Sequence, residues 1–300
     1  MPPSFFFLGK GGVGKSTSSA LTALGLAREG RRVLLASLDP AHNQCDIFQR
    51  ELSDRPTQVA PELSVVEVDQ DRWIQRYLAE VEERIHENYR YLTAFNLEKY
   101  FRVLRHAPGL EEHALVMAFE WILQRFGEAD ALVFDMAPTA LSLKFFNLPA
   151  LTLVWAHHLL RLRREIMEKR EIITRVRLLD REIEIDRVQR RLHESIERYT
   201  RLKELFEDAG RTRITLVMNP DQLSLAESLR IAEGLKGLGI RVGRVLVNRV
   251  TPEAEPALDR IREEFPRLGL VTVPRSERPL IGLHALREFL ESGRFPIPRL

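Results

Sequence analysis

The stretch Gly9-Lys10-Gly11-Gly12-Val13-Gly14-Lys15-Ser16-Thr17 fits the pattern G-x-x-x-x-G-K-[ST]. It follows an apolar run at residues 5–8 and precedes an Ala/Leu-rich stretch at residues 20–27. This order predicts a strand, a glycine-rich loop and a helix, which is the context in which the pattern binds phosphates. Glycines let consecutive backbone N–H groups point at a phosphate chain, and the helix N-terminus adds a positive dipole. All nine residues are therefore expected to form a nucleoside triphosphate site, in which Lys15 contacts the β and γ phosphates and Ser16 holds Mg²⁺.

Lys10 occupies a position at which the general pattern accepts any residue. The form K-G-G-V-G-K-[ST] is similar to the deviant loop of a dimerising branch of P-loop ATPases. That similarity implies that Lys10 reaches across a subunit interface to the nucleotide of the partner. The alternative interpretation is a lysine that is simply solvated on the loop.

The length of 300 residues suits one large α/β domain with insertions or two small domains, and we favour the first. With 45 basic and 43 acidic residues the net charge is +2, so the charge balance predicts no nucleic-acid partner. Cys45 is the only cysteine, which excludes an intramolecular disulfide and a zinc site built on two cysteines. The N-terminus lacks a signal-peptide pattern, and no eighteen apolar residues run together. We therefore expect a cytoplasmic protein without stable membrane insertion.

Two further apolar runs end in a carboxylate. Residues 33–38 end at Asp39, which Pro40 keeps out of helical conformation, at the strand end where α/β sheets bind ligands. An alternative role for Asp39 is to cap the next helix. Residues 131–135 end at Asp135 in the form of a Walker B element, whose aspartate holds Mg²⁺.

Strand-like runs at residues 63–69, 214–218, 242–247 and 271–273 alternate with helical stretches. This alternation predicts a doubly wound, mainly parallel α/β sheet. Two helical insertions, at about residues 70–126 and 150–209, interrupt it, so we expect one P-loop domain over residues 1–300 with an inserted helical subdomain. The second insertion would reach roughly 90 Å as one rod. We therefore expect a turn near Leu179, Asp180 and Arg181 that folds it into a hairpin.

The chain resembles the arsenical-pump and tail-anchored-protein-targeting ATPases over residues 4 to about 290. The resemblance rests on four stretches: Lys10 to Thr17, Asp39-Pro40-Ala41-His42-Asn43, Asp135-Met136-Ala137-Pro138-Thr139, and Asn219-Pro220-Asp221-Gln222-Leu223-Ser224-Leu225 with Glu227. It implies an ATPase that needs ATP and Mg²⁺, closes as a dimer on ATP and opens on hydrolysis.

The resemblance also implies roles for individual residues. Asp39 would activate the attacking water, Asp135 would hold the Mg²⁺ shell, and Lys10 would stabilise charge at the partner's phosphates. Asp221 and Asn248 would contact the nucleoside. The insertions would form a client-facing surface, whose expected lining is Trp73, Tyr77, Phe101, Leu159, Leu162 and Ile166.

Three differences from the family bear on function. Ala140-Leu141 replaces the usual Gly-His after Pro138-Thr139, no cysteine pair follows Asn248, and the chain has one ATPase half where the pump enzymes have two. We favour a targeting factor or chaperone for a hydrophobic protein client, acting as a homodimer or as a heterodimer with a paralogue. The alternative is a regulatory or positioning ATPase of the MinD and ParA type, which generally lacks such insertions. Arsenite efflux fits less well.

Overall fold

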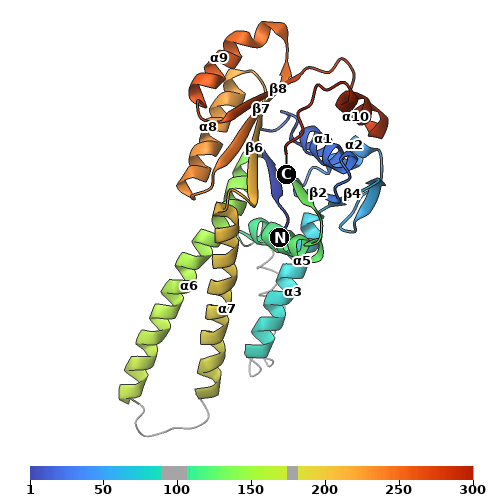
Figure 1. Ribbon diagram of the computed structural model, residues 1–300. Helices are drawn as coiled ribbons and strands as arrows, with labels where there is room; N and C mark the ends of the chain where they lie inside the picture. The colour runs from blue at the N-terminus through green and yellow to red at the C-terminus, as the bar shows by residue number, and fades with distance from the viewer. Residues whose placement is uncertain (89–106, 108, 174–181, 300) are drawn as a thin grey trace.

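The computed structural model describes residues 1–88, 107, 109–173 and 182–299. Among these residues, eight strands form one sheet in the order β3-β4-β2-β5-β1-β6-β7-β8. The strands are β1 (Ser4–Leu8), β2 (Val33–Ser37), β3 (Thr57–Ala60), β4 (Leu63–Glu67), β5 (Ala131–Asp135), β6 (Thr212–Met218), β7 (Val242–Val250) and β8 (Gly269–Pro274). All neighbours pair in parallel except β3 with β4. Helices cover both faces (Figure 1), which confirms the predicted doubly wound α/β fold.

The helices are α1 (Lys15–Arg28), α2 (Asn43–Phe48), α3 (Gln70–Asn88), α5 (Leu110–Arg125), α6 (Thr139–Ile173), α7 (Glu182–Glu207), α8 (Gln222–Gly237), α9 (Glu255–Glu264) and α10 (Gly282–Glu291). Three elements were not predicted: α2, α10 and the edge strand β3. All three are short, with six, ten and four residues. The six residues of α2 and the four of β3 give too few turns or alternations for a periodic apolar pattern to stand out, whereas the ten residues of α10 carry such a pattern and were missed within the loop expected after Pro274.

The carboxyl ends of the three central strands lie side by side. Strands β1, β2 and β5 are buried along their whole length, as expected for parallel strands covered on both faces. The register aligns Asp135 with Phe7 of β1 and with Ser37 of β2. The loops that follow these strands therefore start side by side at one edge of the sheet.

Alternate residues of β1 enter two separate cores. Phe5 and Phe7 face the layer that contains α1, α2 and α10. Phe6 faces the layer that contains α5, α6 and α8, where its ring stacks on Phe134 at a centroid distance of 4.8 Å. Phe119, Phe145, Phe146 and Phe206 surround this pair within 6.3 Å of Phe6 or of one another. This aromatic cluster fixes the bases of α5, α6 and α7 beneath the sheet.

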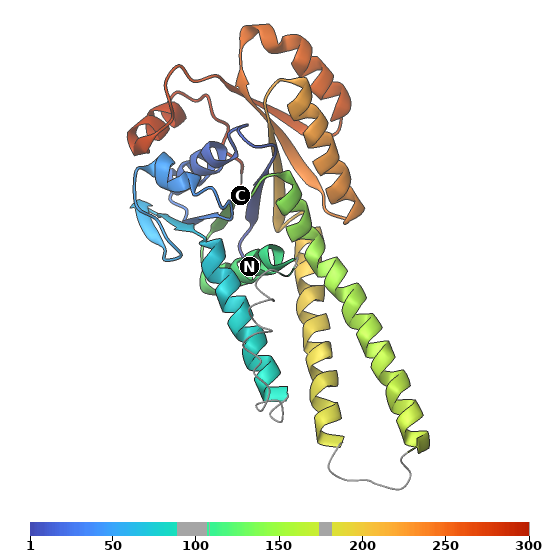
Figure 2. The same ribbon diagram turned by 180° about the vertical axis from the view of Figure 1, so that it is seen from behind.

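Helices α6 and α7 run side by side away from the sheet, and α3 extends in the same direction (Figures 1 and 2). The helix that contains the second insertion starts at Thr139 rather than near residue 150, and it includes Pro149. The expected turn at Leu179, Asp180 and Arg181 lies outside the described residues. The same holds for the end of the helix expected over residues 72–101, of which α3 covers the part up to Asn88.

One helical stretch among the described residues, Thr139–Ile166, is long and apolar enough by composition to cross a membrane. Only 33% of its apolar window is buried in the protein. The expectation that no segment spans a membrane rested only on the absence of eighteen consecutive apolar residues. By length and composition, that expectation is not supported for this stretch.

Candidate nucleotide site

The P-loop connects β1 to α1, and two of its glycines are required by the backbone geometry. Gly14, the residue before α1, has a φ of 95°, in the left-handed region that glycine adopts without strain. At Gly9, an added Cβ atom would lie 2.1 Å from the carbonyl oxygen of Val217 on β6. Both glycines therefore allow the loop to fold tightly over the ends of the central strands.

Asn248 of β7 supports this loop from the other side. Its Nδ2 atom donates to the carbonyl oxygen of Val13 at 2.8 Å, and its Oδ1 atom accepts from the N–H of Arg249 at 2.9 Å. A Cβ atom on Gly14 would lie 2.3 Å from this Nδ2 atom. The structure thus places Asn248 at the P-loop, with its amide already bonded to the protein backbone.

Lys15 lies under the loop with only 5% of its surface exposed. Its Nζ atom donates to the carbonyl oxygen of Lys10 at 3.3 Å. Burial lowers the pKa of Lys15, while the carboxylates of Asp135 and Asp39 act in the opposite direction. The lysine and both carboxylates therefore belong to one electrostatic cluster, as their sequence positions predicted.

Asp135 is fully buried at the end of β5. Its Oδ2 atom accepts from the Nε2 atom of Gln44 at 2.9 Å, and the side chain of Ser16 lies close enough to lower the pKa of Asp135. Burial raises the pKa of Asp135 to about 6, although Ser16, Gln44 and Lys15 oppose the shift. Its Oδ1 atom has no hydrogen-bond partner among the described residues. A hydroxyl beside an unsatisfied carboxylate oxygen is the type of hard oxygen donor set that suits Mg²⁺.

Asp39 is 5% exposed and starts the loop between β2 and α2. Its Oδ1 atom accepts from the N–H of Ala41 at 3.0 Å, and its own N–H donates to the Oγ atom of Ser37 at 3.4 Å. The alternative role for Asp39 as a helix cap is wrong, because α2 begins at Asn43 with His42 as its N-cap. Its carboxylate is thus held by its own loop, close to Lys15.

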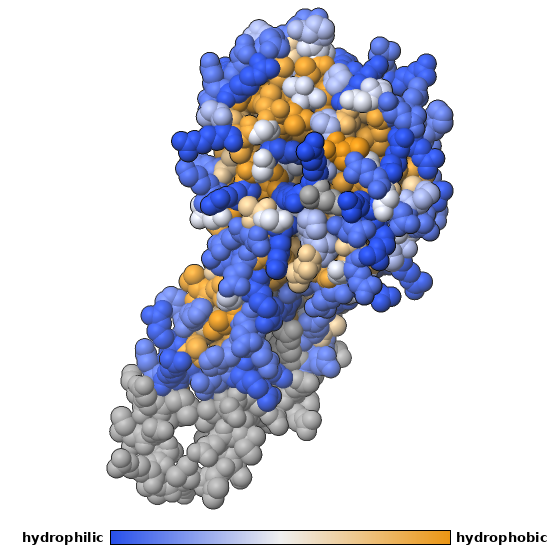
Figure 3. All heavy atoms as spheres, in the orientation of Figure 1, coloured by the Kyte–Doolittle hydropathy of each residue, from blue (hydrophilic) through white to orange (hydrophobic). Residues whose placement is uncertain are grey.

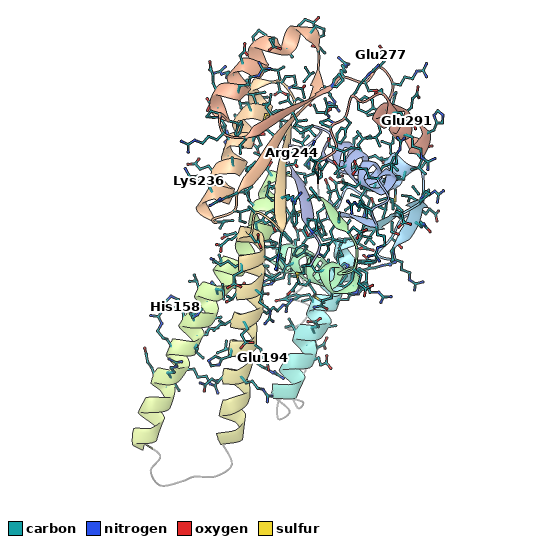
Figure 4. The ribbon with its side chains drawn as sticks, in the orientation of Figure 1. His158, Glu194, Lys236, Arg244, Glu277 and Glu291 are labelled. Carbon is teal, nitrogen blue, oxygen red and sulfur yellow. The ribbon has the colours of Figure 1, made fainter. Side chains whose placement is uncertain are left out.

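A cavity of about 550 Å³ opens beside the P-loop, a volume within the range for small-molecule sites. Gly14, Thr17, Ser18 and Asn248 line one side of it. The loop after β8 lines the other side with Arg275, Glu277 and Arg278, among other residues. Figure 4 labels Glu277 on this loop, away from the paired helices. From the sequence, Pro274 was expected to open a polar loop, and Glu277 and Pro279 supported the family resemblance, but neither was predicted to line the site.

Asp221 does not line this cavity. Its Oδ1 atom accepts from the N–H of Ser224 at 2.8 Å and its Oδ2 atom from the hydroxyl of Ser224 at 2.8 Å, so it caps α8. Lys10 lies close enough to Asp221 to interact with it electrostatically. Of the two residues expected at the nucleoside, Asn248 borders the cavity and Asp221 is engaged as a helix cap.

The residues expected on the client surface differ in their exposure. Leu159, Leu162 and Ile166 of α6 are 46%, 52% and 46% exposed. The prediction that Trp73 lines this surface is wrong, because Trp73 is 3% exposed and its indole N–H donates to Asp54 at 3.2 Å. Tyr77 is half-buried and stacks on His113 at 5.1 Å. Phe101 lies outside the described residues.

Comparison with known proteins gives matches along nearly the whole chain. A family model described as "Anion-transporting ATPase" matches residues 3–292. A putative arsenical pump-driving ATPase of Aquifex aeolicus is 29% identical over 299 residues, which cover 95% of this chain and 97% of that protein. The arsenical pump-driving ATPase of Escherichia coli is 28% identical over 87% of this chain and 42% of its own length. An ATPase ASNA1 homolog of Cryptosporidium parvum is 29% identical over 82% of this chain and 64% of its own length.

Proposed function

The chain belongs to the anion-transporting ATPase family, and on that basis we propose that it uses ATP to bind and release a hydrophobic segment of a client protein. The observation that carries the proposal is a row of exposed apolar side chains on α6. We call this row the α6 stripe; its members are Leu151, Val154, Trp155, Leu159, Leu162 and Ile166, with exposed fractions of 46% to 63%. They follow one another at intervals of one, three or four residues, so they lie along one side of the helix.

Isolated exposed apolar residues are common on proteins, but a continuous row of them normally marks a binding surface. One member of the α6 stripe, Val154, also lines a shallow cavity of about 430 Å³ beside α6, together with Leu153 and with the stems of histidine and basic side chains of α6 and α7. In Figure 3 a patch of hydrophobic residues lies among hydrophilic ones on the part of the helical arm nearest the sheet. From Leu151 to Ile166 the stripe runs roughly 22 Å, a length that accommodates about four turns of an apolar helix. A transmembrane or similarly apolar helix is therefore the client that fits it.

The nucleotide site supplies the driving reaction. The backbone N–H groups of the P-loop, with Lys15, bind the phosphates, and Asn248 borders the nucleoside cavity. The carboxylate of Asp39 accepts a proton from the attacking water. The Asp39 carboxylate is oriented for this role because its Oδ1 atom accepts a hydrogen bond from the N–H of Ala41.

The hydroxyl of Ser16 and the carboxylate of Asp135 would hold Mg²⁺, which neutralises charge on the phosphates during phosphoryl transfer. The unsatisfied Oδ1 atom of Asp135 supports this assignment. Lys10 reaches the phosphates of a partner subunit, which is either a second copy or a paralogue. The protein acts in the cytoplasm. Asp221, close to Lys10, contributes to the nucleoside site in the closed dimer.

The names of several relatives refer to an arsenical pump. Soft metalloids prefer thiolate ligands, and this chain has one cysteine, Cys45. The thiol of Cys45 donates to the buried carboxylate of Glu67 at 2.6 Å. These observations favour client binding over arsenite sensing.

The test measures binding of a fluorescently labelled transmembrane peptide to the Asp39→Asn protein, with and without ATP and Mg²⁺. A ligand shifts a conformational equilibrium only through its different affinities for the two states. We expect peptide affinity to rise with ATP and to fall at least about 10-fold in the double variant Leu162→Asp/Ile166→Asp, because the peptide would face buried carboxylates.

The matched control is the double variant Leu223→Asp/Ile281→Asp, which adds the same two charges at apolar residues outside α6 that are 69% and 49% exposed. This variant should bind peptide as the parent does. If the peptide ignores both nucleotide and the α6 substitutions, the helical pair is not a client surface. The positioning-ATPase alternative would then be the better explanation.

A further inference from the structure

Gln44 connects three parts of the nucleotide site. It is the second residue of α2, five positions after Asp39, and its side chain is completely buried. Its Nε2 atom lies 2.9 Å from Asp135 Oδ2, 3.1 Å from the carbonyl oxygen of Ser16 and 3.2 Å from the Oγ atom of Ser19. One amide group therefore joins the loop of Asp39, the first turn of α1 and the end of β5.

The backbone of Gln44 is fixed independently of its side chain. Glu67, at the end of β4 and 2% exposed, accepts from the N–H of Gln44 at 3.0 Å and from the N–H of Cys45 at 3.3 Å. The thiol of Cys45 donates to the same carboxylate, and the imidazole of His42 lies 3.6 Å from it. The carboxylate thus satisfies N–H groups in the first turn of α2, where a helix has unpaired donors. Because its backbone is held in this way, the side-chain amide of Gln44 has few alternative positions.

We propose that Gln44 is a positioning residue, which orients the Asp135 carboxylate toward Mg²⁺ and links that carboxylate to the loop of Asp39. The inference rests on the role proposed above for Asp135. Gln44 occupies Oδ2 of Asp135 and leaves Oδ1 as the oxygen without a protein partner among the described residues. Carboxylates that bind metals are commonly oriented by such a hydrogen bond, and removing the donor typically reduces metal affinity 10- to 100-fold.

The chemistry of an amide suits this role. A neutral donor fixes the carboxylate but leaves its negative charge for the cation, whereas a lysine or arginine at this position would compete with Mg²⁺ for that charge. Because Gln44 belongs to α2, a displacement of the Asp39 loop also alters the contact with Asp135. The same residue therefore couples the placement of the proposed water-activating group to that of the proposed metal ligand.

The test separates positioning from simple core packing. Gln44→Met keeps the length of the side chain and removes the donor, and Gln44→Glu keeps the shape but replaces the amide nitrogen with oxygen. A fluorescent ATP analogue is titrated against each variant in Mg²⁺ and in EDTA. We expect the gain in affinity on adding Mg²⁺ to fall 10- to 100-fold in both variants, with the affinity in EDTA changed less than about threefold. The Mg²⁺ concentration for half-maximal ATP turnover should rise in parallel.

Gln58→Met is the matched control, because Gln58 is exposed on the edge strand β3. It should leave all three measurements unchanged. Asp135→Asn distinguishes the two proposals: if this variant keeps the full Mg²⁺ effect, the role of Asp135 itself is refuted. If Asp135→Asn loses the effect but Gln44→Met and Gln44→Glu keep it, Gln44 is only a core residue. Should Gln44→Met fail to fold, the isosteric Gln44→Glu variant decides the question.

Discussion

Replacing Gly14 with alanine tests how the P-loop is held in place. An alanine at the φ of 95° found here is strained by about 1–2 kcal/mol. Its methyl group would also lie 2.3 Å from Nδ2 of Asn248, which would have to give up its bond to Val13. Losing that bond costs about 0.5–1.5 kcal/mol. We therefore expect Gly14→Ala to lower the free energy of unfolding by about 2–3 kcal/mol and the melting temperature by roughly 3–5 °C.

The assay is urea unfolding of the nucleotide-free protein, and Gly11 provides the matched control. Gly11 does not have a positive φ, and an added Cβ atom there would meet no atom within 4 Å. Gly11→Ala should therefore change the free energy of unfolding by less than about 1 kcal/mol. In an Asn248→Ala background the methyl group meets no amide, so the cost of Gly14→Ala should fall to the backbone strain of about 1–2 kcal/mol. An equal cost in both backgrounds would refute the proposed contact between Gly14 and Asn248.

Three other predictions concern catalysis, assembly and pH. Asp39→Asn should bind a fluorescent ATP analogue within a few-fold of the wild type but release phosphate at least about 100-fold more slowly, since the carboxylate acts on water; equal losses in both assays would contradict this role. Light scattering should show a dimer that tightens with ATP and Mg²⁺ and ignores zinc chelators, because Cys45 is the only cysteine; a dimer that dissociates in chelator alone would show the interface to be misplaced. The pKa of Asp135 is about 6 in the folded protein against an ordinary 3.8, so the folded state binds this proton more tightly. Its burial penalty is therefore absent below about pH 4 and complete above about pH 6, where it reaches at most about 3 kcal/mol. In the nucleotide-free protein, the stability of the wild type relative to Asp135→Asn should thus decrease as pH rises through this window, and a constant difference would show that Asp135 does not titrate there.

The strands at the centre of the sheet could be predicted because their burial leaves a direct trace in the sequence. Continuous apolar runs end at Leu8, at Asp39 and at Asp135, and the structure aligns these strands in one parallel sheet. The edge strand β3 left no such trace. It has four residues, pairs in antiparallel fashion and contains a register shift between Gln58 and Ala60.

Gln44 and Glu67 could not be identified from sequence, because their partners come from different elements. Glu67 is a carboxylate at the end of the apolar strand β4, as Asp135 is at the end of β5, and that position was the only available signal. Its relation to Gln44 depends on how β4 and α2 meet in three dimensions. The spacing of residues along the chain does not predict this contact between β4 and α2.

The error at Trp73 has a related cause. Helical periodicity finds the apolar side of α3 but does not say what covers that side. In the structure the ring of Trp73 lies 5.7 Å from that of Trp121 on α5, so this side forms part of the core. The apolar residues of α6 have no such cover among the described residues, and Leu159, Leu162 and Ile166 remain exposed.

The start of α6 has a mechanical consequence. The helix begins at Thr139, four residues after Asp135, and continues for 35 residues, or roughly 52 Å. Its first residue lies next to the phosphate site, so the helix can act as a lever. A tilt of about 10° at Thr139 would move the other end of the helix by about 9 Å. Pro149 has no N–H to donate to the carbonyl of Phe145, so the rod is weakest in bending near its base. A change too small to alter the sheet can therefore become a movement wider than a side chain at the end of the arm.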